Sequence, residues 1–139
     1  MSINKSSIVS DVMLNVNEFP IIKKNTIFKD ALEKMIVHKI GIVCIVDDNF
    51  KLIRLFTDGD LRRTLLSVQK PLSALFMDDI LDYTGLNPFT INPETLITNA
   101  TKIMGERRVW DLPVVDRKQK LIGLFHLHRT LEYILKEYN

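Results

Sequence analysis

The sequence predicts an α/β fold made of two copies of one small unit, and three observations support this prediction. The chain has 139 residues, of which 46% are apolar, enough to build a compact core. Residues 22–56 align without a gap to residues 91–125, an offset of 69 positions (91 minus 22). Within each copy, a helical apolar pattern precedes two short strand-like runs. We therefore expect two similar domains, each combining helices with a small sheet.

The internal repeat is supported by identities that are mostly apolar and in register. Eleven of the 35 aligned positions carry the same residue. These pairs are Ile22/Ile91, Thr26/Thr95, Ala31/Ala100, Met35/Met104, Val46/Val115, Asp47/Asp116, Lys51/Lys120, Leu52/Leu121, Ile53/Ile122, Leu55/Leu124 and Phe56/Phe125. Because the matches keep the apolar pattern of each segment, both copies are expected to fold alike.

The first copy opens with a short extended segment at residues 19–23. Thr26 is expected to cap the helix that follows. The apolar face of this helix carries Ile27, Ala31 and Met35. Residues 40–46 and 52–56, joined by the polar turn D-D-N-F-K, read as a strand pair. A closing helix is predicted near residues 61–68.

The second copy repeats this order, with an extended segment at residues 89–92 and Thr95 as the expected helix cap. The apolar face of its helix carries Leu96, Ala100 and Met104. Residues 112–115 and 121–125, joined by D-R-K-Q-K, form the predicted strand pair, and the closing helix lies near residues 130–137. The predicted unit is thus strand, helix, strand, strand, helix.

The expected domain boundaries follow from the repeat. Residues 1–68 form the first repeat, residues 69–78, with Pro71, form a linker, and residues 79–139 form the second repeat. One unit of about 60 residues leaves an apolar sheet face exposed and is marginal alone. We therefore expect the two small sheets to pack face to face, leaving the outer helices available for a homodimer.

Composition excludes several classes of protein. Nineteen basic and seventeen acidic residues leave a formal charge of +2, too weak to predict a nucleic-acid or membrane surface. The single cysteine, Cys44, lies in an apolar run and excludes a disulfide framework. The N-terminus lacks the apolar segment of a signal peptide, and no stretch reaches the ~20 apolar residues of a membrane span. A cytoplasmic protein without nucleic-acid or membrane partners is expected.

Several motifs give the chain a resemblance to the cystathionine-β-synthase (CBS) domain family, in which two domains form a Bateman module. The motifs are V-S-D-V-M at residues 9–13, the T-x4-A-x3-M helices, D-L-P-V-V-D at 111–116 and L-I-G-L at 121–124. The stretches V-S-D-V-M, F-T-D-G-D-L-R-R at 56–63 and G-L-F-H-L-H at 123–128 together make it similar to the C-terminal CBS pair of arabinose 5-phosphate isomerases, the enzymes that feed Kdo synthesis for lipopolysaccharide or capsule. The T-D-G-D-[LI]-R-R element also occurs in CBS pairs of sugar-nucleotidyltransferases.

The resemblance implies a regulatory module that senses a nucleotide, either AMP- or ATP-like or CMP-sugar-like, with no required cofactor. Its implied partners are a small-molecule nucleotide, a sugar isomerase domain or subunit, and a second copy of the chain. The isomerase catalytic domain has no counterpart here, and no catalytic motif is present. The alternatives are a purely structural dimerisation module without ligand, the CBS pair of a sugar-nucleotidyltransferase and, supported least, a free-standing enzyme.

The principal candidate site is T-D-G-D at residues 57–60, where a strand leads into a helix. Thr57 and Asp60 have nearly the spacing of a capping box, a purely structural feature. A helix N-terminus also favours a phosphate, and an acid one turn in can hold ribose hydroxyls. In CBS domains the residues that match Thr57 and Asp60 play these two parts, and Asp58 between them is included as a ligand-binding candidate.

Further ligand-binding candidates surround this motif. Arg62 and Arg63 offer fork-shaped donors to a phosphate, although arginines on a helix are often only solvated. The resemblance also places Val43 with Cys44, and Leu112 with Pro113, as walls around a nucleobase. Arg54 stands where these domains usually carry glycine, so it either intrudes on the pocket or meets a ligand's negative charge.

The second copy departs from its own pattern, because His126 and Arg129 stand where the first copy has Thr57 and Asp60. This second site has lost its ribose acceptor, so it either recognises an anion or is empty. His128 completes an H-x-H sequence, but strand alternation would separate the two rings, so no metal site is predicted. Trp110 could stack on a base, although packing against the sheet edge is favoured.

Overall fold

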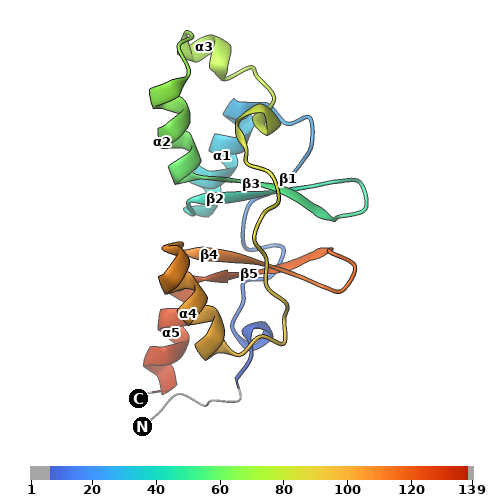
Figure 1. Ribbon diagram of the computed structural model, residues 1–139, viewed down its shortest axis with the longest axis vertical. Helices are drawn as coiled ribbons and strands as arrows, with labels where there is room; N and C mark the ends of the chain where they lie inside the picture. Colours follow the sequence, from blue (N-terminus) through green and yellow to red (C-terminus); the bar gives the residue numbers. More distant parts are fainter. Residues whose placement is uncertain (1–6, 138–139) are drawn as a thin grey trace. The chain divides into compact units, whose positions relative to one another are not determined.

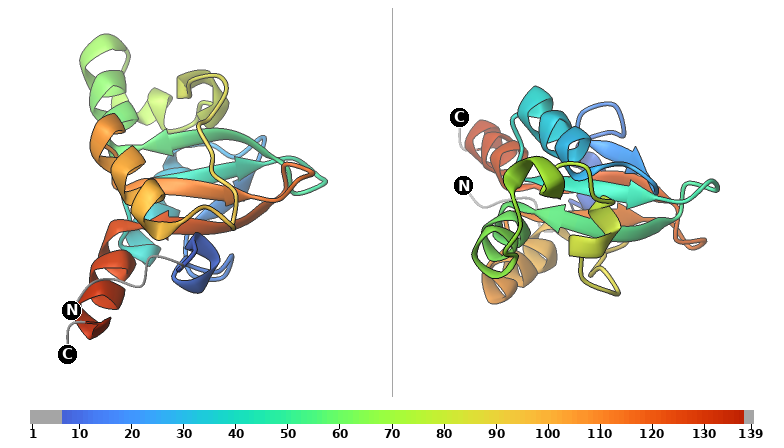
Figure 2. Two further views of the ribbon diagram at one scale, coloured as in Figure 1. Left: turned by 60° about the horizontal axis from the view of Figure 1, so that its bottom comes forward. Right: turned by 90° about the horizontal axis from the view of Figure 1, so that it is seen from above.

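The computed structural model describes residues 7–137, which fold into two compact units (Figure 1). The first-copy unit spans Glu18–Pro88, and the second-copy unit combines residues up to Asn17 with residues from Phe89 onward. Each unit has one sheet with its main helices on the same face (Figures 1 and 2). The expected absence of a targeting segment concerns residues 1–6, which lie outside the described residues.

The first-copy unit contains the predicted order of elements. They are β1 (Ile21–Lys23), α1 (Phe28–His38), β2 (Ile42–Val46), β3 (Leu52–Thr57) and α2 (Asp58–Ser67), followed by α3 (Leu72–Leu75) and the 3-10 helix η2 (Ile80–Tyr83). The sheet order is β1-β2-β3, with β1 parallel and β3 antiparallel to β2. The central strand β2 is buried along its whole length. Under the helices, the Phe28 ring meets Phe56 and Tyr83 edge-on, with centroid distances of 5.3 and 5.4 Å.

The second-copy unit confirms the same order with one difference at its start. Its elements are the 3-10 helix η1 (Val9–Asp11), α4 (Ile97–Arg107), β4 (Asp111–Val115), β5 (Leu121–His126) and α5 (Leu127–Glu137). The antiparallel pair β4-β5 forms the sheet. In place of a strand like β1, residues 89–92 contribute one parallel bridge, between Ile91 and Val114. None of the helices in the part of the chain described here is long and apolar enough to cross a membrane.

The expected threonine caps are wrong. The N-cap of α1 is Ile27 and that of α4 is Leu96, and neither makes a side-chain cap hydrogen bond. Thr26 Oγ1 instead donates to Lys23 O at 2.6 Å, and Thr95 Oγ1 donates to Asn92 Oδ1 at 3.1 Å. Both threonines therefore stabilise the turn before the helix rather than the helix itself.

Two segments, which we call straps, supply the missing caps from elsewhere in the chain. Residues 78–85 form the first-copy strap, in which Asp78 O accepts from Phe28 N at 2.8 Å. Residues 7–14 form the second-copy strap, in which Ser7 O accepts from Ile97 N at 3.0 Å. A strap carbonyl thus satisfies a backbone N–H that the helix leaves free.

Each strap is also fastened through a side chain. Ser7 Oγ lies 3.0 Å from the hydroxyl of Tyr133 on α5. Asp78 accepts from Lys70 Nζ at 2.6 Å and from the Tyr83 hydroxyl. The Lys70 hydrogen bond holds the pKa of Asp78 below its ordinary value of 3.8, and the hydrogen bond to Asp78 raises the pKa of Tyr83 above 10.0.

The compact units divide the chain differently from the repeats. The strap at residues 7–14 precedes the first copy in sequence but packs in the second-copy unit. The whole predicted linker, residues 69–78, belongs to the first-copy unit and includes α3, a helix that was not predicted. The boundaries at 68 and 78 stay predictions about the repeats.

Candidate functional site

The candidate nucleotide site lies at the junction where β3 ends at Thr57 and α2 begins at Asp58. Cross-strand pairing of Thr57 with Ile42 holds the end of β3, and Asp58 N donates to Gly41 O at 2.9 Å. Thr57 has an extended backbone, with φ −121° and ψ 168°, as expected of an N-cap residue. The strand therefore delivers the Thr57 hydroxyl directly to the first turn of α2.

Thr57 and Asp60 form the predicted capping box. Asp60 N donates to Thr57 Oγ1 at 3.2 Å, and Thr57 N donates to Asp60 Oδ2 at 2.9 Å. The Thr57 hydroxyl also lies 3.1 Å from Asp60 Oδ2 and donates to it. The structural interpretation of this motif is confirmed, and it fixes one carboxylate oxygen of Asp60 against the backbone.

Arg63 occupies the other oxygen of the Asp60 carboxylate. Its Nη2 donates to Asp60 Oδ1 at 2.6 Å, and the two side chains are 70% and 19% exposed. An ion pair this exposed contributes only about 0.2–1 kcal/mol. A ligand with hydroxyl groups that bind Oδ1 could therefore displace Arg63 at little cost.

Gly41 belongs to this junction and was missed by the sequence analysis. A Cβ at Gly41 would clash with the Asp58 carboxylate, which lies against the bare backbone there. The repeat alignment carries the signal, because Gly41 matches Trp110 and Asp58 matches Leu127 in the second copy. The backbone hydrogen bond survives the exchange, since Leu127 N donates to Trp110 O at 3.0 Å.

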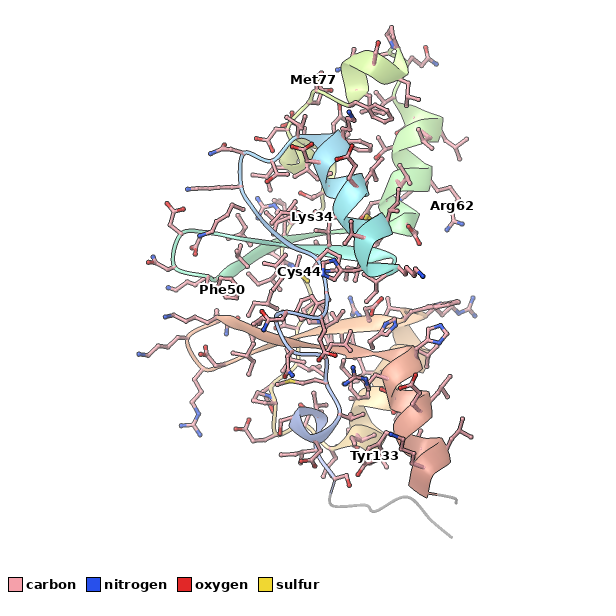
Figure 3. The ribbon with its side chains drawn as sticks, turned by 180° about the vertical axis from the view of Figure 1, so that it is seen from behind. Lys34, Cys44, Phe50, Arg62, Met77 and Tyr133 are labelled. Atoms are coloured by element: carbon pink, nitrogen blue, oxygen red, sulfur yellow. The ribbon has the colours of Figure 1, made fainter. Side chains whose placement is uncertain are left out.

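The remaining candidates of the first copy do not converge on the capping box. Arg62 is exposed and points away from α2 (Figure 3). Val43 is fully buried in the core under the helices, so only its backbone could meet a ligand. Cys44 is also fully buried, and its N–H donates to Pro20 O at 3.0 Å. Arg54 is half-buried, and its Nη1 donates to Ile53 O at 2.8 Å.

In the matching junction of the second copy, a histidine side chain contacts an aspartate side chain on the neighbouring strand. His126 Nδ1 lies 2.6 Å from Asp111 Oδ1, and these side chains are only 15% and 9% exposed. Their contact follows from the strand register, in which Asp111 pairs with His126 as Ile42 pairs with Thr57. Asp111 was not predicted, because this contact spans fifteen positions and the strand register shifts between Val114 and Val115, so that counting back from the Val115–Leu121 pair would place Phe125 opposite Asp111.

The expected separation of His126 from His128 is wrong. β5 ends at His126 and His128 lies in α5, so strand alternation does not apply to it. The two ring centroids are 5.4 Å apart. Across residues 7–137, no group of three or more histidine, cysteine, aspartate or glutamate side chains is arranged to hold a metal ion. Arg129 is half-buried in the first turn of α5.

The second-copy positions chosen as nucleobase walls are both buried. Leu112 is 2% exposed and belongs to the core under α4 and α5, and Pro113 is buried in the same strand. The Pro113 carbonyl accepts from Ile91 N at 3.0 Å. Trp110 is 63% exposed, so the expectation that it packs against the sheet edge is wrong. Its indole is free to contact a ligand or partner.

The comparisons with known proteins agree with the repeated architecture. The CBS domain family matches residues 9–67 and 78–136. A crystal structure of CBSX2 in complex with AMP has a TM-score of 0.83 and 26% identity, covering 95% of this chain and 98% of that one. A structure of CBSX2 from Arabidopsis thaliana gives a TM-score of 0.81 over 96% of this chain and 99% of that one, also at 26% identity.

Curated relatives are longer than this chain. Arabinose 5-phosphate isomerase KdsD of Escherichia coli K12 is 31% identical over 123 residues, which is 88% of this chain and 36% of that protein. An uncharacterised protein of Helicobacter pylori J99 is 34% identical over 125 residues, with coverages of 89% and 36%. The chain thus spans little more than a third of these relatives. From the two family matches and the shared architecture, the chain belongs to the CBS domain family and is a tandem pair of these domains.

Proposed function

We propose that this CBS pair is a regulatory module that binds an adenine or cytosine nucleotide, or a nucleotide-sugar, at Thr57 and Asp60. The observation that carries the proposal is the capping box at the β3–α2 junction, which combines a hydroxyl and an acid at a helix N-terminus. A relative of similar architecture, CBSX2, binds AMP, which supports a nucleotide over other ligand classes. The second copy lacks both the hydroxyl and the acid at these positions.

The binding mechanism is an exchange of partners at Asp60. Ribose hydroxyls donate to Asp60 Oδ1 in place of Arg63 Nη2, while Oδ2 keeps the hydrogen bond that it accepts from Thr57 N. The released guanidinium of Arg63 then turns to the phosphate, which lies at the positive end of the α2 dipole. This exchange keeps the Asp60 carboxylate hydrogen-bonded and places the positive charge of Arg63 beside the phosphate.

The regulated activity is proposed to be an arabinose 5-phosphate isomerase carried by a longer protein or a partner subunit. This proposal rests on the relatives of that name, of which the chain spans 36%. The module itself supplies no catalysis, and nucleotide binding changes the packing of its helices and so the activity of the attached isomerase. We place the protein in the cytoplasm, where nucleotides and phosphosugars are available.

A second candidate function is a structural homodimerisation module. It is favoured by exposed apolar side chains on the helices, since Ile36 and Val37 of α1 are each 74% exposed and Leu66 of α2 is 82% exposed. A second copy that covered them would remove this surface from water. Sedimentation of the chain as a dimer without any ligand response would favour this function over nucleotide sensing.

A thermal-shift panel tests the proposed function. AMP, ADP, ATP, CMP, CMP-sugars and S-adenosylmethionine are added separately to the wild-type chain and to Asp60→Ala. A ligand at 100 times its dissociation constant stabilises the folded state by about 2.7 kcal/mol. We expect one nucleotide to raise the melting temperature of the wild type but not of the variant. A flat response across the panel would refute nucleotide sensing.

A further inference from the structure

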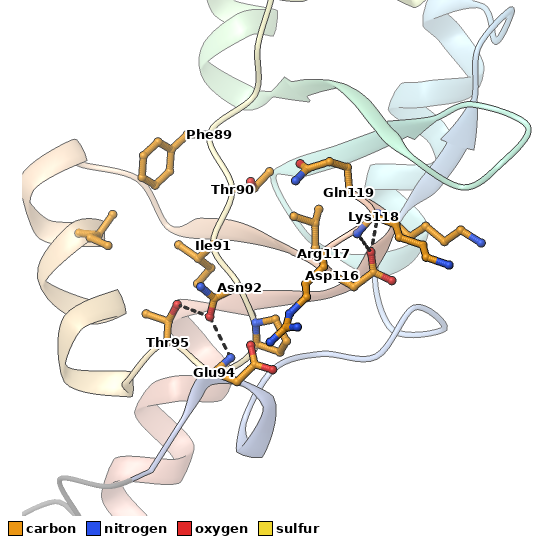
Figure 4. Close-up of a pocket in the computed structure, with 14 residues that line it drawn as sticks. Phe89, Thr90, Ile91, Asn92, Glu94, Thr95, Asp116, Arg117, Lys118 and Gln119 are labelled. Atoms are coloured by element: carbon orange, nitrogen blue, oxygen red, sulfur yellow. Dashed lines mark hydrogen bonds between the residues drawn. The ribbon is translucent and has the colours of Figure 1, made fainter.

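A groove in the second-copy unit lies apart from the strand-to-helix junction of that unit. It runs between residues 89–95 and the β4–β5 turn at residues 116–120, with a volume of about 850 Å³ (Figure 4). Its apolar side is formed by Phe89, Ile91 and Ile103. The β5–α5 junction of the same unit lies at the other end of β5, and none of the capping-box residues lines the groove.

The turn at the rim of the groove is positively charged. It reads D-R-K-Q-K, one acid and three bases for a net +2, whereas the matching D-D-N-F-K of the first copy has two acids and one base for a net −1. Asp116 Oδ1 accepts from the backbone N–H groups of Lys118 and Lys120 at 2.8 and 3.0 Å, so its carboxylate closes the turn. Within residues 7–137, Arg117 makes no ion pair, which leaves its guanidinium available.

Neutral and acidic polar groups complete the lining. Figure 4 shows Arg117 extending along the groove toward Glu94, and Gln119 extending toward Thr90. Asn92 Oδ1 accepts from Glu94 N at 3.0 Å and from Thr95 Oγ1 at 3.1 Å, which fixes the loop that carries Glu94. The groove therefore holds a guanidinium, a carboxylate, an amide and a hydroxyl beside an apolar wall.

One end of the groove is stiffened by a cation–π contact. The guanidinium carbon of Arg107 lies 3.9 Å from the centroid of the Phe89 ring. Arg107 belongs to the last turn of α4, so the helix anchors the ring although Phe89 is 38% exposed. The wall of the groove is thus held in place before any ligand enters.

We propose that this groove is a second binding site of the chain, for a small hydroxylated phosphate monoester. A guanidinium binds phosphate through two parallel hydrogen bonds, and carboxylate, amide and hydroxyl groups recognise the hydroxyls of a polyol. The apolar wall contacts the carbon skeleton. The site is independent of the proposed nucleotide site, because it uses residues of the second copy only.

Nuclear magnetic resonance titration of the ¹⁵N-labelled chain with ribose 5-phosphate tests the proposal. We expect saturable shifts at residues 89–95 and 116–120, and weaker binding of ribose and of inorganic phosphate, each of which supplies half of the contacts. Arg117→Gln should weaken binding about tenfold, since it removes a charge-assisted hydrogen-bond pair. Lys102→Gln, which removes the same charge from an exposed position of α4 outside the groove, should bind as the wild type does.

The Asp60→Ala variant separates this site from the proposed nucleotide site. Ribose 5-phosphate should bind it with wild-type affinity, whatever its effect on nucleotides. If ribose 5-phosphate shifts instead gathered at residues 57–63 and disappeared in Asp60→Ala, the groove proposal would be overturned and the nucleotide site supported. Absence of saturable shifts at residues 89–95 and 116–120, or equal affinity in Arg117→Gln, would also overturn it.

Discussion

The β3–α2 and β5–α5 junctions stand at the same place in the two copies, but different interactions hold them. The first uses contacts within one turn, between Thr57 and Asp60, at the N-terminus of α2. The second uses a cross-strand contact between His126 and Asp111. The backbone hydrogen bonds into both helices are the same, at 2.9 and 3.0 Å. A fold can therefore keep its geometry while only one copy keeps the groups for a ligand.

The copies also differ at the outer edge of the sheet. In the second copy, Leu14 of the strap exchanges two hydrogen bonds with Leu124, at 2.8 and 3.1 Å. Gly123 makes room for them, because a Cβ there would clash with Met13 Sδ and lie 3.0 Å from Leu14 O. The first copy has Arg54 at the matching position. This glycine thus supports strap pairing rather than a ligand.

The largest effect is expected from giving the second copy the residue of the first at this edge. Gly123→Arg should lower the free energy of unfolding by about 2–4 kcal/mol, because the strap must move and its pairing with β5 is lost. Urea denaturation measures this change. Gly105→Ala is the matched control, since no atom lies within 4 Å of the added methyl group. It should stabilise α4 by about 0.5–1 kcal/mol, and equal effects of both substitutions would contradict the assigned role.

The capping box should give the next largest effect. Asp60→Ala removes the acceptor for Thr57 N, and we expect a loss of about 1 kcal/mol in the free energy of unfolding. Asp60→Asn keeps an oxygen that can accept this hydrogen bond, so it should recover most of the loss. Both are measured by urea denaturation. Equal destabilisation by the two variants would show that charge, rather than capping, stabilises this turn.

The Asp111–His126 contact can be tested by replacing these two residues with the isoleucine and threonine that stand at the matching positions of the first copy. Asp111→Ile and His126→Thr should each destabilise the unit by about 1–3 kcal/mol, because each leaves a half-buried polar partner unsatisfied. The double variant carries the Ile–Thr pair of the first copy and should lose less than the sum. A double-mutant cycle measures the coupling, and strict additivity would contradict an interaction between the two side chains.

The smallest effect on stability is expected from the hydrogen bonds that Asp78 of the first-copy strap accepts from Lys70 and Tyr83. The pKa of Asp78 is lowered, so its contribution is present above pH 3.8 and disappears as the pH falls through the depressed value. The pKa values of Lys70 and Tyr83 are raised, so their contribution is complete below pH 10 and disappears at higher pH. Asp78→Asn should flatten both limbs of the stability profile, measured by thermal melting against pH. If the melting temperature of Asp78→Asn fell at low and at high pH as it does in the wild type, the Asp78 hydrogen bonds would not be the cause of this pH dependence.

The distance in sequence between interacting residues explains what could be predicted. The strands, the main helices and the Thr57–Asp60 box are written in local patterns and were predicted. The Thr26 cap was wrong because Phe28 N donates to the carbonyl of Asp78, fifty positions further along the chain (78 minus 28). His126–Asp111 depends on hairpin register, and the exposure of Trp110 depends on packing around it. These three features depend on contacts between residues far apart in the sequence, which local patterns do not predict.

Calorimetric titration with AMP tests the central claim that only the first copy retains nucleotide-binding groups. The wild-type chain, Asp60→Ala and Arg129→Ala are compared, with the folded state of each confirmed by its melting curve. We predict saturable binding to the wild type, unchanged binding to Arg129→Ala, and at least a tenfold loss in Asp60→Ala, which corresponds to about 1.4 kcal/mol. AMP binding that was kept by Asp60→Ala and lost by Arg129→Ala would contradict the account.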